Sequence, residues 1–297
     1  MTVPLFVELL LAGVVVGGLY ALMAFSFSLI LATTHVLNVA HGVFMVLGAA
    51  GVTLLVRHLG LPVAMGFAAV GVGFVAVGAL VYATLVRPLS DREPGEVLVG
   101  SILVTFGLAL AAEALLGFYW ARLVEPQPVF ALTPRVASLR LGEVVVSGSR
   151  AVALLFTALA VAILHLLLVR TRIGKEARAV AQNAIGARII GLEPRRVAAA
   201  VLTVGITAAA LSGAVFVLAI PLTPYEGLRL TMIAFTVSAA GGVGNLPGAL
   251  AAGVALGVAE VFTGYWVGPV WSPMTSLLVL FGVLLLRPVG LLGGAGR

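Results

Sequence analysis

Residues 150–169 read RAVALLFTALAVAILHLLLV, and this stretch decides the fold class. After Arg150 it contains no Asp, Glu, Lys or Arg. A helix needs about 20 apolar residues to cross ~30 Å of hydrocarbon, and this run has that length. A strand of a membrane β-barrel would instead alternate apolar and polar residues over about ten positions. The stretch therefore predicts a membrane-spanning α-helix.

Apolar runs of the same kind recur along the chain. Charges, prolines and glycine clusters delimit candidate spans at residues 5–31, 36–56, 61–86, 97–120, 150–169, 197–220 and 270–287. A further apolar region, 229–265, is interrupted and splits into two pieces, which raises the count to eight or nine. We therefore predict an all-α polytopic membrane bundle with eight or nine segments, some of them broken, in a single domain over residues 1–297.

The composition supports a membrane protein. Hydrophobic residues make up 62% of the chain and charged residues 9%, whereas soluble domains have roughly 45–50% and about 25%. A soluble enzyme and a disordered chain are thereby excluded, and the absence of Cys excludes disulfides and thiolate metal sites. The 36 glycines suit close helix packing in a bilayer. Residues 1–31 lack Lys and Arg and stay apolar for longer than a signal-peptide core, so we expect a retained span there.

The net charge of +6 is concentrated in one segment. Residues 170–196 carry seven basic and two acidic side chains, a net +5. Because loops rich in Lys and Arg stay on the cytoplasmic side, we expect this segment and the chain end with Arg287 and Arg297 to be cytoplasmic. The connection 121–149 should then lie outside, and an odd number of spans would place the amino end outside as well.

Within the basic segment, residues 174–192 read GKEARAVAQNAIGARIIGL. Small apolar residues recur near the helical period and predict a short amphipathic cytoplasmic helix, which Gly191 and Pro194 end. The face lacks Trp and Phe, so it is weakly suited to membrane insertion. A small apolar face favours docking in a groove of a protein partner, and a surface helix at the lipid headgroups is the alternative.

Two polar interruptions stand out in the apolar runs. If the stretch TTHVLNVAHG at 33–42 is helical, Thr34, Asn38 and His41 share one face, which would line a path through the bundle. The alternative is a helix end at the headgroups, with Asn38 as cap and His41 solvated. No third ligand accompanies the two histidines of the stretch at ordinary spacing, so we expect no metal site.

The second interruption is GGVGNLPG at 241–248, which cannot comfortably continue a helix. Broken backbone at membrane depth is tolerated only where it is buried in protein or lines a cavity, and a plain loop between two spans is the alternative. The candidate residues for a substrate path or helix break are Asn38, His41, Gly42, Gly241, Gly242, Gly244 and Asn245.

Other chemistry is sparse. The only lysine is Lys175, so the chain has no phosphate-binding loop of the G-x-x-x-x-G-K-[ST] type, and no catalytic constellation is evident. We expect no enzyme and no cofactor in this chain. Glu113 and Glu260 lie in apolar runs and Glu8 lies near the first span. A proton-coupled secondary carrier would use such carboxylates as relays, which is one alternative function.

The motifs together resemble a known family. GLYAL at 18–22 and LNVAHG at 37–42 look like the G-x-x-Y-A-L and I-N-F-A-H-G signatures of LivH-type permeases, subunits of bacterial importers for branched-chain amino acids. The run from Ala234 to Glu260 is similar to that family's G-G-x-G-S-x-x-G-A … E stretch. Val39 replaces the Phe and Asn245 the Ser of these patterns.

The resemblance implies a multi-pass permease in the bacterial inner membrane, without affinity for nucleic acid. Its partners would be a second, LivM-like permease, two cytoplasmic ATPase subunits that bind ATP and Mg, and an extracytoplasmic amino-acid-binding protein. By position alone, the residues implied in ATPase coupling are Gly174, Glu176, Ala177, Arg178, Ala184 and Gly191. A urea or amide permease of the same family is the nearest alternative.

Overall fold

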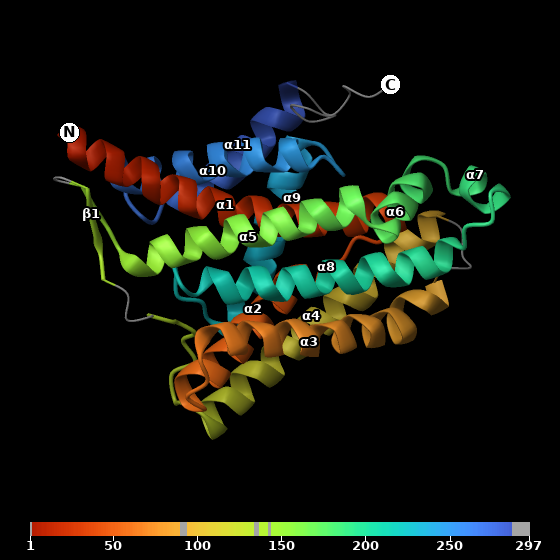
Figure 1. The fold of residues 1–297 in the computed structure, drawn as a ribbon, viewed down its shortest axis with the longest axis horizontal. Coiled ribbons are helices and arrows are strands. Elements are labelled where there is room, and N and C mark those ends of the chain that lie inside the picture. Colours follow the sequence, from red (N-terminus) through yellow and green to blue (C-terminus); the bar gives the residue numbers. More distant parts are fainter. Residues whose placement is uncertain (1, 90–93, 134–136, 142–143, 287–297) are drawn as a thin grey trace.

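Helices dominate the computed structural model, which describes residues 2–89, 94–133, 137–141 and 144–286, and most of them run along one common axis (Figure 1). The first half contains α1 (Val3–Thr34), α2 (His41–Thr53) with a π-helical turn (Leu54–His58), α3 (Val63–Val81) with a π-helical turn (Tyr82–Val86) and a 3-10 turn (Arg87–Leu89), and α4 (Pro94–Leu123). The second half contains α5 (Gly148–Arg170), α6 (Arg172–Gln182), α7 (Ala184–Ile189), α8 (Pro194–Phe216), a 3-10 turn (Pro224–Glu226), α9 (Gly227–Gly241), α10 (Leu246–Trp266) and α11 (Ser272–Leu286).

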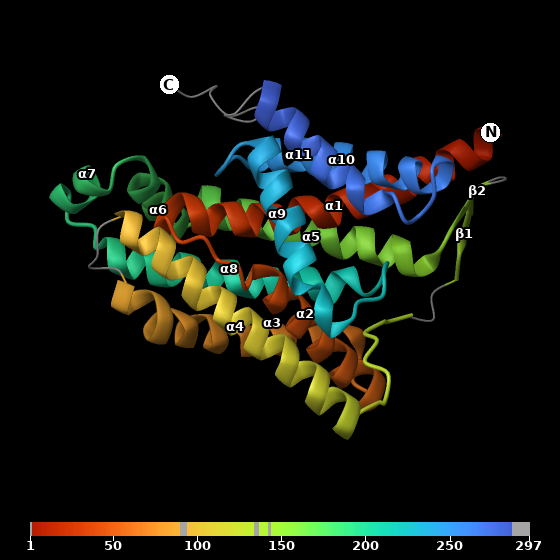
Figure 2. The same ribbon diagram turned by 180° about the vertical axis from the view of Figure 1, so that it is seen from behind.

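The predicted class, a polytopic all-α bundle, is confirmed, while the count of membrane-length helices differs from the predicted eight or nine segments. Among the described residues, seven helices are long and apolar enough to cross a membrane. The difference arises at α9 and α11, which have 15 residues each. At 1.5 Å per residue such helices span about 22 Å, short of the ~30 Å hydrocarbon core. Helix α9 also crosses the direction of its neighbours (Figure 2).

The two long connections lie at opposite ends of the bundle. A small antiparallel hairpin, β1 (Leu139–Leu141) and β2 (Val144–Val146), lies at the same end as the start of α1. Helices α6 and α7 lie at the other end, which we call the α7 end (Figure 1). This arrangement is what the predicted topology requires of 121–149 and 170–196. Arg287 and Arg297 lie outside the described residues.

Glycines allow helices α1 and α10 to pack closely against each other. Gly17 of α1 faces Gly253 and Val254 of α10, and a Cβ at Gly17 would lie 2.5 Å from the Cα of Val254. Gly257 faces Gly13 and Gly17 in the same way. Both helices therefore present glycines four residues apart to each other, the small-residue spacing that allows close approach in a bilayer.

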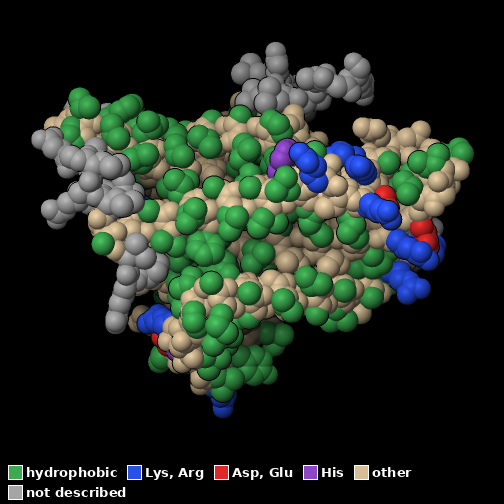
Figure 3. Space-filling model, viewed as in Figure 1, with side chains coloured by type: hydrophobic (Ala, Val, Ile, Leu, Met, Phe, Trp, Pro, Cys, Tyr) green, Lys and Arg blue, Asp and Glu red, His purple; other side chains and the backbone are tan. Residues whose placement is uncertain are grey.

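Helices α2 and α8 form the centre of the bundle, whereas α3, α4 and α5 expose most of their surface. The exposed surface is largely apolar, and basic side chains gather at the α7 end (Figure 3). An apolar groove of about 1050 Å³ runs between α3 and α5, with α8 as its floor. Such a surface suits hydrocarbon rather than water.

Candidate functional site

The first interruption is a true break between α1 and α2. Helix α1 ends at Thr34 because His35 adopts a left-handed conformation (φ 55°), and α2 begins only at His41. The residues between them are not helical. The prediction of one helical face shared by Thr34, Asn38 and His41 was therefore wrong, as was a span that starts at residue 36.

Side-chain hydroxyls satisfy the backbone of this break, hereafter the first break (residues 35–40). Three N–H groups at or beside it donate to neighbouring helices: Leu37 to Ser101 Oγ (3.3 Å), Val39 to Thr105 Oγ1 (3.0 Å) and Gly42 to Thr231 Oγ1 (2.8 Å). Thr231 also donates to the carbonyl of Val39 (2.9 Å) or of Gly227 (3.0 Å). Buried backbone groups without partners are costly, so α4 and α9 make a non-helical segment possible inside the bundle.

His41 is fully buried, so the alternative in which it is solvated was wrong. Its Nε2 lies 3.1 Å from the carbonyl oxygen of Met23 and 3.2 Å from Ser26 Oγ. The ring meets Phe27 edge-on, with centroids 5.4 Å apart. His41 thus fastens the first turn of α2 to α1.

Asn38 does not cap α2. The residue at the cap position is Ala40, without a side-chain hydrogen bond. The Asn38 side chain is 2% exposed, and its Oδ1 and Nδ2 have no partner among the described residues. A buried amide with unused hydrogen-bonding groups is unusual, and it makes Asn38 the strongest polar candidate for contact with a passing solute.

The second break, residues 242–245 between α9 and α10, was predicted and is present. Gly242 (φ 93°) and Gly244 (φ 81°) adopt conformations that a side chain disfavours. Asn245 caps α10 by accepting from the N–H of Gly248 (3.1 Å). The backbones of Gly241 and Gly248 touch, since a Cβ at Gly241 would lie 2.5 Å from the carbonyl oxygen of Gly248.

One turn of α1, residues 26–28, joins the two breaks. Ser26 contacts His41 beside the first break, and Ser28 Oγ accepts the N–H of Gly244 in the second. Between them, Phe27 packs edge-on against both His41 and Phe235 of α9. The roles of these serines and of the hydroxyls of α4 and α9 were not predicted from the sequence, although polar residues in apolar spans were the available signal.

Thr231→Val tests the support of the first break. The variant leaves the buried N–H of Gly42 without its acceptor, which costs about 1–3 kcal/mol. We expect a lower unfolding temperature in detergent and reduced transport. Thr236→Val is the matched control on α9, because Thr236 Oγ1 donates only to the carbonyl of Met232 in its own helix (2.8 Å). Equal losses in both variants would contradict a supporting role for Thr231.

The intramembrane carboxylates have structural partners. The Glu113 carboxylate of α4 faces the backbone N–H groups of Gly227 and Leu228, the free donors at the start of α9, and its Oε1 has no hydrogen-bond partner among the described residues. An anion at a helix N-terminus is also favoured by the helix dipole. Glu113 therefore caps α9 from a neighbouring helix.

Glu260 belongs to a second polar cluster that joins α1, α9 and α10. Its carboxylate lies close to the hydroxyl of Tyr20, which also lies close to Arg229. Arg229 in turn forms an ion pair with Glu226. Glu8 lies in the second turn of α1.

The basic segment forms two helices rather than the single helix predicted. Helix α6 ends at Gln182, and Asn183 caps α7 by accepting the N–H of Gly186 (2.8 Å). Gly191 (φ 84°) follows the end of α7. Asn offers the backbone a hydrogen bond that competes with helix continuation, which explains the break.

The predicted docking face of this segment was wrong. Ala177, Val180 and Ala187 are buried against Leu29 of α1 and against α8. Gly174 lies against Leu168 of α5, and Arg178 Nη1 donates to the Leu168 carbonyl (2.8 Å). Glu176 and Ala184 are half-buried. The apolar stripe therefore holds the segment on its own bundle.

A different apolar surface of this segment is exposed. Ile185, Ile189 and Ile190 are 73%, 81% and 73% exposed, and we call them the isoleucine patch. They lie at the α7 end, where basic side chains gather (Figure 3). Large aliphatic side chains this exposed outside a membrane span mark an interaction surface.

Comparisons with known proteins agree with one another. A family model described as "Branched-chain amino acid transport system / permease component" matches residues 9–287. The chain is 29% identical to the high-affinity branched-chain amino acid transport system permease protein LivH of Escherichia coli K12, over 97% of the chain and 96% of that protein. It is 27% identical to the corresponding protein BraD of Pseudomonas aeruginosa, with the same coverage.

A solved structure, PsaBC from Streptococcus pneumoniae in complex with Fab, is 12% identical and superposes with a TM-score of 0.49 over 93% of the chain and 91% of that protein.

Proposed function

Because the chain belongs to the family of branched-chain amino acid transport system permease components, we propose that it is a permease subunit of an ATP-driven importer for branched-chain or other hydrophobic amino acids. It acts in the bacterial inner membrane beside a second permease. Two cytoplasmic ATPase subunits hydrolyse ATP, and an extracytoplasmic binding protein delivers the substrate. The family match over residues 9–287 and the seven membrane-length helices support this proposal.

The isoleucine patch carries the proposal that the chain couples to an ATPase. Ile185 and Ile189 project from α7 and Ile190 directly follows it, while the opposite face of α6 and α7 is fixed to α1 and α8. A push on α7 from a bound partner is therefore passed to the bundle. Three exposed isoleucines suit an apolar groove on that partner, and fully burying each contributes about 1.5–3 kcal/mol.

The two breaks support a proposed substrate path through the bundle. Helix ends and irregular backbone at membrane depth supply polar groups that continuous helices lack. Asn38 has free hydrogen-bonding groups at the first break, and Gly241, Gly242, Gly244 and Asn245 form the second. We place the solute near these breaks, where α1 connects them through residues 26–28.

A site-specific crosslink tests the coupling surface. A photoreactive amino acid at Ile189 should crosslink to an ATPase subunit in membranes that contain the whole transporter. The same probe at Leu59, which is 65% exposed in the turn before α3, is the control and should give no ATPase adduct. Recovery of lipid adducts alone from position 189 would rule out docking through α7.

A proton-coupled carrier is the competing function. Variants of Glu113 distinguish this carrier from an ATP-driven importer. Glu113→Gln keeps oxygen acceptance toward the start of α9, so an importer should retain at least half of its uptake. Glu113→Leu removes the acceptor and should lower both stability and uptake. A proton relay would fail in both variants, because neither side chain titrates. Leucine uptake in a strain lacking the native permease measures the difference.

A urea or amide permease of the same family is the remaining alternative. The names of the LivH and BraD relatives, both branched-chain amino acid permeases, support an amino acid as the substrate. Competition of labelled leucine uptake by excess urea, acetamide or valine distinguishes the substrates: valine should compete and urea should not.

A further inference from the structure

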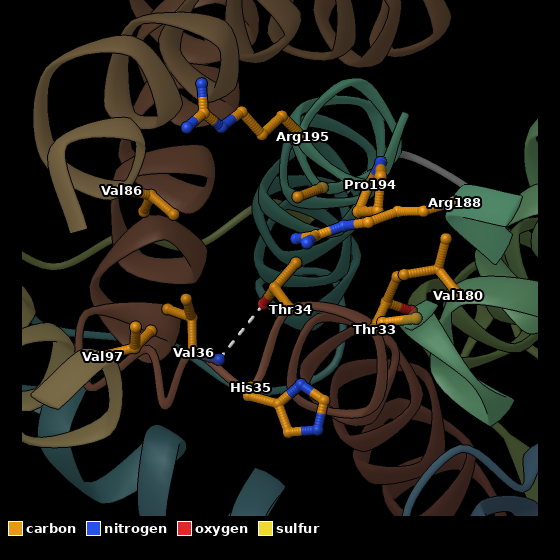
Figure 4. A pocket seen from close by; sticks show the side chains of 12 residues that line it. Thr33, Thr34, His35, Val36, Val86, Val97, Val180, Arg188, Pro194 and Arg195 are labelled. Carbon is orange, nitrogen blue, oxygen red and sulfur yellow. Dashed lines mark hydrogen bonds between the residues drawn. The ribbon is translucent and has the colours of Figure 1, made fainter. Parts of the chain in front are cut away.

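A cavity at the α7 end borders the start of the first break, at His35 and Val36. It has no role in the function proposed above. Its volume is about 280 Å³. The wall comes from the end of α1, the turn after α3, α4, the coupling helices α6 and α7, and the start of α8. Figure 4 shows Arg188 reaching from α7 across the cavity toward Thr34, with Val36, Val86 and Val97 on the far wall.

The charge of the lining favours an anion. The described residues that line the cavity include Arg188 and no Asp or Glu; Arg195 also lines it but is engaged by another partner. No hydrogen bond or ion pair within the described part of the chain engages the Arg188 guanidinium. A guanidinium presents paired donors that match the two oxygens of a carboxylate. Thr33 adds a hydroxyl to the lining.

The apolar part of the cavity lining favours a ligand with a small aliphatic side chain. Valines and alanines form it, including Val36, Val97, Val180 and Ala198, and the described lining contains no Phe, Tyr or Trp on which a ring or nucleobase would stack. The volume equals that of about nine water molecules at ~30 Å³ each, below the range of drug-sized ligands. The occupant therefore has one carboxylate and a short aliphatic chain.

We propose that this cavity is a regulatory site for a small aliphatic carboxylate, the chemistry shared by branched-chain amino acids and the 2-oxo acids derived from them. The regulatory part rests on the proposed importer function. A bound carboxylate would tie Arg188 of α7 to the end of α1 and the start of α8. Since α7 carries the isoleucine patch, occupancy restrains the element that transmits ATPase motion and slows the importer when its product accumulates inside.

Direct binding tests the site without ATPase or binding protein. The purified chain in lipid nanodiscs is titrated with labelled leucine and, separately, labelled 4-methyl-2-oxopentanoate. We expect saturable binding of at least one of them, and the two titrations show whether the amino acid or the oxo acid is the occupant. Arg188→Gln should weaken binding at least tenfold, and Ala198→Leu, which fills the cavity, should abolish it.

Ala200→Leu is the matched control, because Ala200 lies on the same helix but faces the α3–α5 groove, and it should bind as the wild type does. Absence of saturable binding, or equal binding in wild type, Arg188→Gln and Ala198→Leu, would overturn the site whether or not the chain is an importer.

The regulatory role is read out in the assembled transporter. The same ligand on the ATPase side should lower substrate-stimulated ATP hydrolysis at least threefold in the wild type and leave Ala198→Leu unaffected. Unchanged hydrolysis in the wild type, with binding intact, would refute the regulation.

Discussion

Replacing Ile185 and Ile189 together by Asp is expected to lower ATP-driven amino acid uptake at least tenfold while the bundle stays folded. Both side chains are exposed, so the bundle loses no packing. The docked complex loses two buried isoleucines, roughly 3–6 kcal/mol, and gains two carboxylates in an apolar groove. Uptake of labelled leucine in cells and co-purification of the ATPase subunits measure the effect.

Leu59→Asp is the control for this double variant, because Leu59 is similarly exposed but lies outside the coupling segment. It should retain uptake and ATPase co-purification. Normal uptake by the double variant would mean that the ATPase docks elsewhere than α7.

Gly17→Leu is expected to prevent assembly of the bundle. The backbone of α10 lies so close that even a Cβ would meet the Cα of Val254 at 2.5 Å. A leucine forces α1 and α10 apart along their glycine contact, and overpacking of this kind costs about 3 kcal/mol or more. We expect loss of the monodisperse peak in size-exclusion chromatography and loss of uptake.

Gly73→Leu provides the comparison on a surface helix. Gly73 lies on the exposed side of α3, and a Cβ there meets nothing within 4 Å. This variant should express and elute as the wild type does. Equal behaviour of the two variants would contradict the close α1–α10 contact.

Much of the fold could be predicted because the signals are local. Continuous apolar runs such as 150–169 identify membrane spans by their length alone. The glycines and the proline of GGVGNLPG predict a break between two helices. The LNVAHG and GLYAL motifs predicted the family that the comparisons confirm.

An interruption between the first two spans was predicted, but the non-helical course of residues 36–40 was not, because its support comes from elsewhere in the chain. The acceptors for Leu37 and Gly42 are Ser101 and Thr231, 64 and 189 residues away. Without them the stretch before Gly42 has no residue that forbids a helix. Propensity is a weak guide where tertiary hydrogen bonds decide.

The docking face of residues 174–192 was predicted wrongly for a related reason. Periodicity shows that a helix has an apolar face but does not show which surface covers it. Small residues such as Ala177 and Ala187 pack closely on α8, so the chain itself covers that face. The break at Asn183 separates α6 from α7 and leaves Ile185 and Ile189 exposed. The prediction of one continuous helix did not include this change of direction.

The most direct test of the importer is reconstituted uptake. Proteoliposomes should contain this chain, the second permease, the two ATPase subunits and the binding protein encoded beside it, with labelled leucine outside. We predict uptake that requires enclosed ATP and that stops when the ATPase subunits are omitted. Uptake by this chain alone, driven by a proton gradient without ATP, would contradict the account.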